Sequence, residues 1–124
     1  MNIQNVDLIG MPTTDQQASL EFYTKILGFE ERVNMAHFEM EGIRWIELVP
    51  ANAKTAIVLS TWEDADSRGT IILVTTDIEA DYAELQAKGL ELPPLERQPW
   101  GISVMITDPA GNELLLQQNI DMSG

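Results

Sequence analysis

The sequence contains no cysteine, so the chain can form no disulfide, no thiolate nucleophile and no zinc–thiolate centre. Basic residues are also scarce, because seven lysines and arginines stand against twenty acidic residues and give a formal net charge of -13. A surface with this charge repels phosphate backbones and anionic lipid headgroups. We therefore expect neither nucleic acid nor a membrane surface as a partner.

Long hydrophobic runs are absent as well. The N-terminal stretch MNIQNVDLIG lacks the basic start and the long apolar run of a signal peptide, and no segment approaches the length of a membrane span. The length of 124 residues, with 44% hydrophobic and 22% charged residues, fits an ordinary soluble domain. We expect a cytoplasmic protein whose residues 1–124 form a single domain.

The most informative feature that is present is an internal repeat. The stretches VDLIGMPTTDQQASLEFYTKILGFE and GTIILVTTDIEADYAELQAKGLEL both run from an apolar strand through Thr-Thr-Asp and a helix to a glycine. In each copy the aspartate, Asp15 or Asp77, is an expected N-cap of the helix. The pattern predicts amphipathic helices near residues 15–27 and 77–88, each ended by a glycine in the left-handed conformation.

Three strand-like runs follow each helix. They are FEERVNMAHFEM, IRWIELV and TAIVLST in the first copy, and a weak run near LELPPLERQ, then ISVMITD and ELLLQQ, in the second. Proline cannot donate to a central ladder, so the weak run is expected at a sheet edge. The sequence predicts an α+β fold of two βαβββ modules, residues 1–62 and 69–124, joined by an acidic connector too short to separate two domains.

Four short stretches, FYTKILGFE, AELQAKGLEL, PWG and DPAGNELLLQ, lie in order around this repeat and with it cover nearly the whole chain. Together they resemble the vicinal oxygen chelate superfamily, the glyoxalase, bleomycin-resistance and extradiol dioxygenase group. The resemblance implies curved mixed sheets that enclose a cavity, usually completed by pairing two chains into a homodimer. It does not fix the chemistry, because function lies in the site and not in the fold.

The resemblance also implies where a metal would bind, since metal-dependent members take His, Gln or Glu ligands from the first and last strands of each module. The corresponding positions in this chain are Leu8, Val58, Thr70 and Leu115. Divalent metals need imidazole or carboxylate donors, and only Thr70 carries a donor atom, a neutral hydroxyl. Glu113 lies two residues before Leu115, on the same strand face but about 6.6 Å away. We therefore predict no metal and no other cofactor, with Glu113 facing the cavity.

Two titratable residues are candidates for a site outside these positions. His37, the only histidine, is either a general base or pocket wall, or a residue on the polar face of a strand shared with Glu39. Glu47 lies in the apolar run RWIELVP. It either has a raised pKa suited to proton transfer or is a solvated acid or a partner of nearby Arg44.

The three tryptophans are the other candidates, because a large flat side chain can wall an aromatic or heterocyclic ligand. Trp100, in PWG before a strand, is favoured over Trp45 and Trp62 for this role, and core or dimer-interface packing is the alternative. The DPAG motif itself is interpreted as turn chemistry, with Asp108 first and Gly111 where a positive φ is needed.

Strand alternation predicts which other side chains line the cavity. If the former ligand positions point inward, the inward set is Leu8, Gly10, Ala56, Val58, Ser60, Thr70, Ile72, Val74, Glu113, Leu115 and Gln117. The helix-facing set is then Ile9, Met11, Ile57, Leu59, Ile71, Leu73, Leu114 and Leu116. The second set is entirely apolar, as a helix-covered sheet face must be.

These features favour a metal-free, homodimeric protein that holds a small organic molecule in a mostly apolar cavity, and the acidic charge suits a cationic ligand. The expected ligand-binding residues are His37, Trp45, Glu47, Val58, Ser60, Thr70, Trp100, Glu113, Leu115 and Gln117. One alternative is an enzyme, either a metal-dependent lyase or dioxygenase with relocated ligands, or an acid/base catalyst that uses His37, Glu47 or Glu113. Another is a structural or interaction partner with little cavity.

Overall fold

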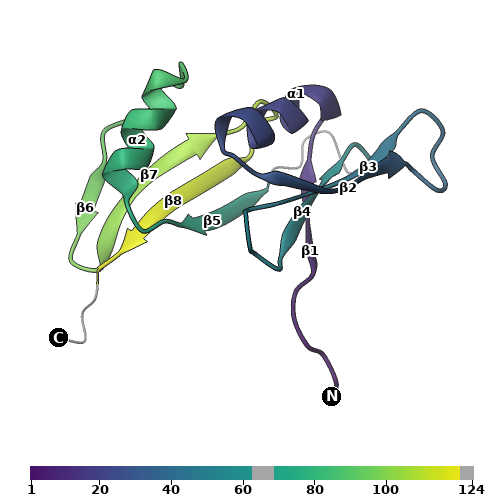
Figure 1. Ribbon diagram of the computed structural model, residues 1–124, viewed down its shortest axis with the longest axis horizontal. Coiled ribbons are helices and arrows are strands. Elements are labelled where there is room, and N and C mark those ends of the chain that lie inside the picture. Colours follow the sequence, from purple (N-terminus) through teal and green to yellow (C-terminus); the bar gives the residue numbers. More distant parts are fainter. Residues whose placement is uncertain (63–68, 121–124) are drawn as a thin grey trace. The chain divides into compact units, whose positions relative to one another are not determined.

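The computed structural model describes residues 1–62 and 69–120, so the predicted acidic connector lies largely outside the described residues. By their internal contacts, residues 1–69 and 70–124 form two compact units. Figure 1 shows the strands and helices that make up each unit.

The first unit is a four-stranded mixed sheet with one helical segment. Its elements are β1 (Leu8–Pro12), α1 (Gln16–Glu21), the π-helical turn η1 (Phe22–Ile26), β2 (Glu30–Ala36), β3 (Arg44–Val49) and β4 (Ala56–Ser60). The strand order is β1-β4-β3-β2, in which β1 and β4 are parallel and the other pairs antiparallel.

The second unit repeats this topology. Its elements are β5 (Thr70–Val74), α2 (Ile78–Ala87), β6 (Glu96–Gln98), β7 (Gly101–Thr107) and β8 (Glu113–Asn119). The order β5-β8-β7-β6 again pairs the first and last strands in parallel, and the weak strand β6 lies at the edge, as expected for the run that contains Pro93 and Pro94. The predicted α+β fold with two βαβββ modules is confirmed.

Both helical segments, α1 with η1 and α2, begin and end near the residues that local chemistry predicts. Asp15 and Asp77 each accept the backbone N–H three residues further on, at 3.0 and 3.1 Å. Gly28 and Gly89 follow the helical segments with φ of 76° and 93°, a conformation that glycine adopts without steric cost. Among the described residues no helix is long and apolar enough to cross a membrane.

The first helix differs from the continuous helix predicted for residues 15–27. It is α-helical only to Glu21, after which the N–H of Leu27 donates to the carbonyl of Phe22 at 3.2 Å, the spacing of a π-turn. The wider turn places Phe22 and its neighbour Tyr23 in the core together, with their rings edge to face at 5.4 Å between centroids.

Burial follows the predicted strand faces most closely in the second unit. Leu114 and Leu116 of β8 are buried, whereas Ile72 and Val74 of β5 are 61% and 68% exposed. In the first unit all five residues of β4 are buried, so that strand is covered on both faces. Ile9 is exposed although it was expected to face the helix, because β1 lies at the sheet edge and α1 packs over β4.

The DPAG turn has the structural function that its sequence predicts. The buried carboxylate of Asp108 accepts the backbone N–H groups of Ala110 and Asn112 at 2.9 and 2.8 Å. Gly111 has φ of 90°. The motif therefore fixes the approach of β7 to β8.

Candidate functional site

Four aromatic rings of the first unit gather into an aromatic cluster formed by His37, Phe38, Trp45 and Trp62. The indoles of Trp45 and Trp62 are stacked, with centroids 5.6 Å apart and planes inclined by 6°. The ring of His37 contacts both indoles edge to face, at 5.8 and 5.0 Å. Phe38 stacks on His37 at 4.8 Å and is itself 76% exposed.

The sheet register explains why these rings meet. Trp45 lies near the start of β3, and antiparallel pairing sets it opposite Met35, two residues before His37. The same β3 pairs with β4 so that Glu47 lies opposite Val58, which brings the end of β4 and the following Trp62 beside the start of β3. Residues far apart in the sequence thus form one surface.

β2 ends at Ala36, just before His37. The expected strand, which ran through His37 to Met40, was therefore too long, and the placement of His37 on its polar face was wrong. The Nδ1 atom of His37 accepts the backbone N–H groups of Glu39 and Met40, each at 3.0 Å, and this turns the chain. Because Nδ1 is an acceptor, the proton of the neutral imidazole lies on Nε2. His37 belongs to the aromatic cluster, and its Nε2–H is a donor at that surface.

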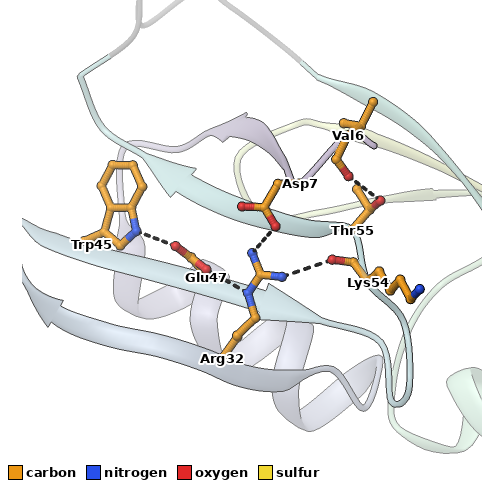
Figure 2. A network of polar contacts seen from close by, with 7 residues as sticks. All are labelled: Val6, Asp7, Arg32, Trp45, Glu47, Lys54 and Thr55. Atoms are coloured by element: carbon orange, nitrogen blue, oxygen red, sulfur yellow. Dashed lines mark hydrogen bonds and ion pairs between the residues drawn. The ribbon is translucent and has the colours of Figure 1, made fainter. Parts of the chain in front are cut away.

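Glu47 is the centre of a polar network that Figure 2 shows from close by. It is 9% exposed, and its two carboxylate oxygens accept the Nε–H of Arg32 at 2.8 Å and the indole N–H of Trp45 at 2.7 Å. Arg32 also donates to the carboxylate of Asp7 at 3.2 Å and to the carbonyl of Lys54 at 3.0 Å. Both oxygens of this buried acid therefore have donors.

The partner of Glu47 is not Arg44, the alternative raised by the sequence. Residues 44 and 47 lie an odd number of positions apart on β3 and so point to opposite faces of the sheet. Arg44 instead donates to the amide oxygen of Asn34 at 2.6 Å. Arg32 reaches Glu47 because the β2–β3 register shifts between Glu31 and Val33, a bulge that re-aims the residue within it.

The pKa of Glu47 is lowered, which contradicts one of the two alternatives that the sequence left open, a raised pKa. Burial is the largest single influence and acts to raise the pKa, because it disfavours the charged carboxylate. The hydrogen bonds from Trp45 and Arg32, together with the positive charge of Arg32, outweigh burial. Glu47 is therefore a carboxylate at neutral pH and is poorly suited to carry a proton.

The remaining predicted site residues of the first unit are buried. Val58 lies opposite Glu47 in the β3–β4 pair. Ser60 is only 1% exposed, and its carbonyl accepts the N–H of Thr13 at 2.9 Å. Their contact with a ligand stays a prediction.

In the second unit, the sheet face away from α2 carries the other predicted residues in ordered rows. We call it the outer face of the second sheet. Residues opposite one another across β5, β8 and β7 share a face, and the register gives three such rows: Thr70, Glu113 and Thr107; Ile72, Leu115 and Met105; Val74, Gln117 and Ser103. A wholly apolar row thus lies between two rows that carry polar side chains.

Trp100, the tryptophan favoured by the sequence, belongs to the second unit, whereas the aromatic cluster belongs to the first. It is 58% exposed and its carbonyl accepts the N–H of Ile120 at 2.9 Å, at the end of β8 opposite to Glu113. Six residues of strand separate the two ends, or about 20 Å. Ligand contact by Trp100 stays a prediction.

The residues at the four metal positions do not fit a metal ion. Leu8, Val58 and Leu115 have no donor atom, and the hydroxyl of Thr70 is neutral. Glu113 lies opposite Thr70 across the parallel β5–β8 pair, but a single carboxylate leaves a divalent ion under-coordinated. Within residues 1–62 and 69–120, no three His, Asp or Glu side chains group closely enough to hold a metal.

The fold and these sequence features define the family. The chain belongs to the Glyoxalase/Bleomycin resistance protein/Dioxygenase superfamily, whose family model matches residues 5–116. A search of curated proteins by sequence found no match.

Solved structures are similar over nearly the full chain. TnmS3, described as an antibiotic binding protein from Streptomyces sp. CB03234, is 32% identical, with a TM-score of 0.87 over 97% of this chain and 99% of that one. A superfamily member from Sphaerobacter thermophilus is 28% identical, with a TM-score of 0.82 over 96% and 100%. Lactoylglutathione lyase from Agrobacterium tumefaciens, 18% identical with a TM-score of 0.73 over 95% and 96%, shares the fold.

Proposed function

We propose that this protein binds a small organic molecule with a flat aromatic ring, and that it does so without a metal ion. The observation that carries the proposal is the stacked pair of Trp45 and Trp62, edged by His37 and Phe38. Large rings held in nearly parallel planes offer an apolar surface with little conformational entropy left to lose on binding.

Each unit carries polar groups that can orient a ligand. The Nε2–H of His37 offers a donor beside the indoles, since Nδ1 is already an acceptor. On the outer face of the second sheet, Glu113, Gln117 and Thr70 flank the apolar row that contains Leu115. A mostly apolar surface with a few polar groups is the usual composition of a small-molecule site.

The ligand class to test first follows from the similarity to TnmS3. That protein is described as binding an antibiotic, and it is 32% identical to this chain over nearly its whole length. We therefore place planar aromatic antibiotics before other metabolites. Among them, cationic compounds suit the formal net charge of -13.

Acid/base catalysis is less well supported than binding. Glu47 is a carboxylate held by Arg32 and Trp45, and the Nδ1 atom of His37 is used by two backbone N–H groups. A metal-dependent lyase or dioxygenase would need ligands away from the four usual positions. Sequestration of an intact ligand requires neither a group that transfers protons nor a metal ion.

A thermal-shift screen tests the proposal. Planar aromatic antibiotics and metabolites are added to the protein, and each hit is measured by calorimetry and checked for chemical change by mass spectrometry. A ligand at one hundred times its Kd stabilises the folded state by about 2.7 kcal/mol. Trp62→Leu should abolish the shift if the aromatic cluster binds, whereas loss in Trp100→Leu alone would place binding at that tryptophan. A hit that is consumed and released altered would favour an enzyme.

A further inference from the structure

The polar network around Glu47 does more than join β2 and β3 to the segments before β1 and β4. We propose that Arg32 and Glu47 are positioning residues that hold the indole of Trp45 in the plane in which it stacks on Trp62. Where ligand binding is concerned, this inference rests on the function proposed above. The orientation of Trp45 can be measured without any ligand.

The first step is the hydrogen bond at the indole. A tryptophan side chain has two torsions, and its ring has one donor, the Nε1–H. In this protein the donor lies 2.7 Å from a carboxylate oxygen of Glu47 on the same strand. Rotation of the ring about its second torsion would break this charge-assisted bond, so Glu47 selects one ring orientation.

The second step is the anchoring of Glu47 itself. Its other oxygen accepts the Nε–H of Arg32 at 2.8 Å, and the remaining two nitrogens of that guanidinium reach Asp7 and the carbonyl of Lys54. All three guanidinium nitrogens are thus engaged, with partners before β1, within β3 and before β4 (Figure 2). The fork geometry of arginine fixes the carboxylate as a single flexible lysine would not.

The third step is the effect on the aromatic cluster. Trp45 and Trp62 are inclined by only 6°, and the ring of His37 contacts both of them. A change in the plane of Trp45 would therefore separate the stacked pair and move its contact with His37. The surface proposed for a flat ligand therefore depends on the hydrogen bond between Trp45 and Glu47.

Energetics favour positioning over stability as the reason for an acid at position 47. Its neighbour across the strands is Val58, in a strand that is buried along its whole length. A well-packed apolar residue is often as stabilising as a buried ion pair, because removing two charges from water is costly. An apolar side chain could not accept the indole N–H, and so could not orient the ring.

Nuclear magnetic resonance of the three indole N–H groups tests the proposal on the full chain, with Trp→Phe variants assigning each peak. We expect the Trp45 peak of the wild type to be shifted downfield and slow to exchange with solvent. In Glu47→Leu it should move upfield and exchange about tenfold faster, as loss of a charge-assisted bond implies. Glu47→Gln and Arg32→Met should also move the Trp45 peak upfield and speed its exchange. These two variants replace Glu47→Leu in the test if that variant does not fold.

Glu79→Gln is the matched control. Glu79 is also paired with an arginine, since it lies 2.6 Å from Arg97. This pair belongs to the second unit, whereas Trp45 and Trp62 belong to the first. The Trp45 peak should be unchanged in this variant. An unchanged Trp45 peak in Glu47→Gln and Arg32→Met as well would overturn the proposal.

A binding cycle with proflavine, a planar aromatic cation, links positioning to the proposed function. We expect Glu47→Gln to raise the Kd about fivefold in the wild-type background and less than twofold in Trp45→Phe, which keeps a ring but has no donor. An equal loss in both backgrounds would show that Glu47 acts on the ligand without Trp45, and would refute positioning. If proflavine does not bind the wild type, this ligand class fails for the proposed function, and the Trp45 peak alone decides the inference.

Discussion

Replacing Glu47 with glutamine tests the physical interpretation of the polar network through protein stability. The change keeps the volume of the side chain but removes its charge and one acceptor. The amide oxygen can then accept from Arg32 or from Trp45 but not from both, and its NH2 group faces the other donor. Hydrogen bonds to charged groups contribute about 1.5 to 3 kcal/mol each.

The lower half of this range applies here. The side chain of Arg32 is 31% exposed, so water screens part of its attraction for Glu47. We expect Glu47→Gln to lower the free energy of unfolding by about 1.5 to 2 kcal/mol at pH 7. Glu79→Gln, whose ion pair with Arg97 is more than 60% exposed on both sides, should change it by less than about 0.5 kcal/mol.

The dependence on pH has a definite sign. Because the folded-state pKa of Glu47 is lowered, its stabilising effect is fully present above the pKa of an unfolded glutamate, about 4.3, and is lost as the pH falls through the lower folded value. The stability gap between wild type and Glu47→Gln should therefore be equal at pH 7 and 5.5 and shrink only below about 4.3. Urea denaturation followed by circular dichroism measures the gap. Coincident curves at pH 7, or a gap that closes between pH 7 and 5.5, would refute this account.

Three further predictions concern the second sheet and assembly. Leu114→Ala, at a fully buried position, should lower the free energy of unfolding measured by urea denaturation by about 2 to 5 kcal/mol. Leu115→Ala, on the outer face, should lower it clearly less, and equal losses would contradict the face assignment. Leu115→Glu should not create tight zinc or manganese binding by elemental analysis after dialysis, since one added carboxylate leaves the ion under-coordinated; a retained equivalent would show donors that this account lacks. We also propose a homodimer, because each sheet ends in edge strands and the second carries exposed Ile72 and Val74; a monomer mass throughout a light-scattering dilution series would count against it.

The features that sequence patterns predicted well are local or periodic. The caps at Asp15 and Asp77 depend on side-chain and backbone groups three residues apart, and so they are visible in the sequence. The alternation along β5 and β8 predicted which residues of the second sheet face its helix, and Leu114 and Leu116 of that set are buried. The edge position of β6 followed from Pro93 and Pro94 just before it, since prolines cannot donate to a central ladder.

The aromatic cluster was beyond sequence reasoning because it depends on register. Trp62 lies in no regular element, and nothing local indicates that it stacks on Trp45. Arg32 reaches Glu47 only through a bulge in β2, and no residue pattern in the sequence predicted that bulge. By contrast, the alternative of Arg44 as the partner could have been set aside from the sequence, since strand parity places residues 44 and 47 on opposite faces.

The most direct test of the central claim is to titrate the best ligand of the thermal-shift screen into the isotope-labelled protein and to follow the three indole N–H peaks. The account predicts that the peaks of Trp45 and Trp62 move together and saturate at the stoichiometry and Kd found by calorimetry. Saturable binding with both of these peaks unmoved would contradict the claim that the stacked tryptophan pair forms the ligand site.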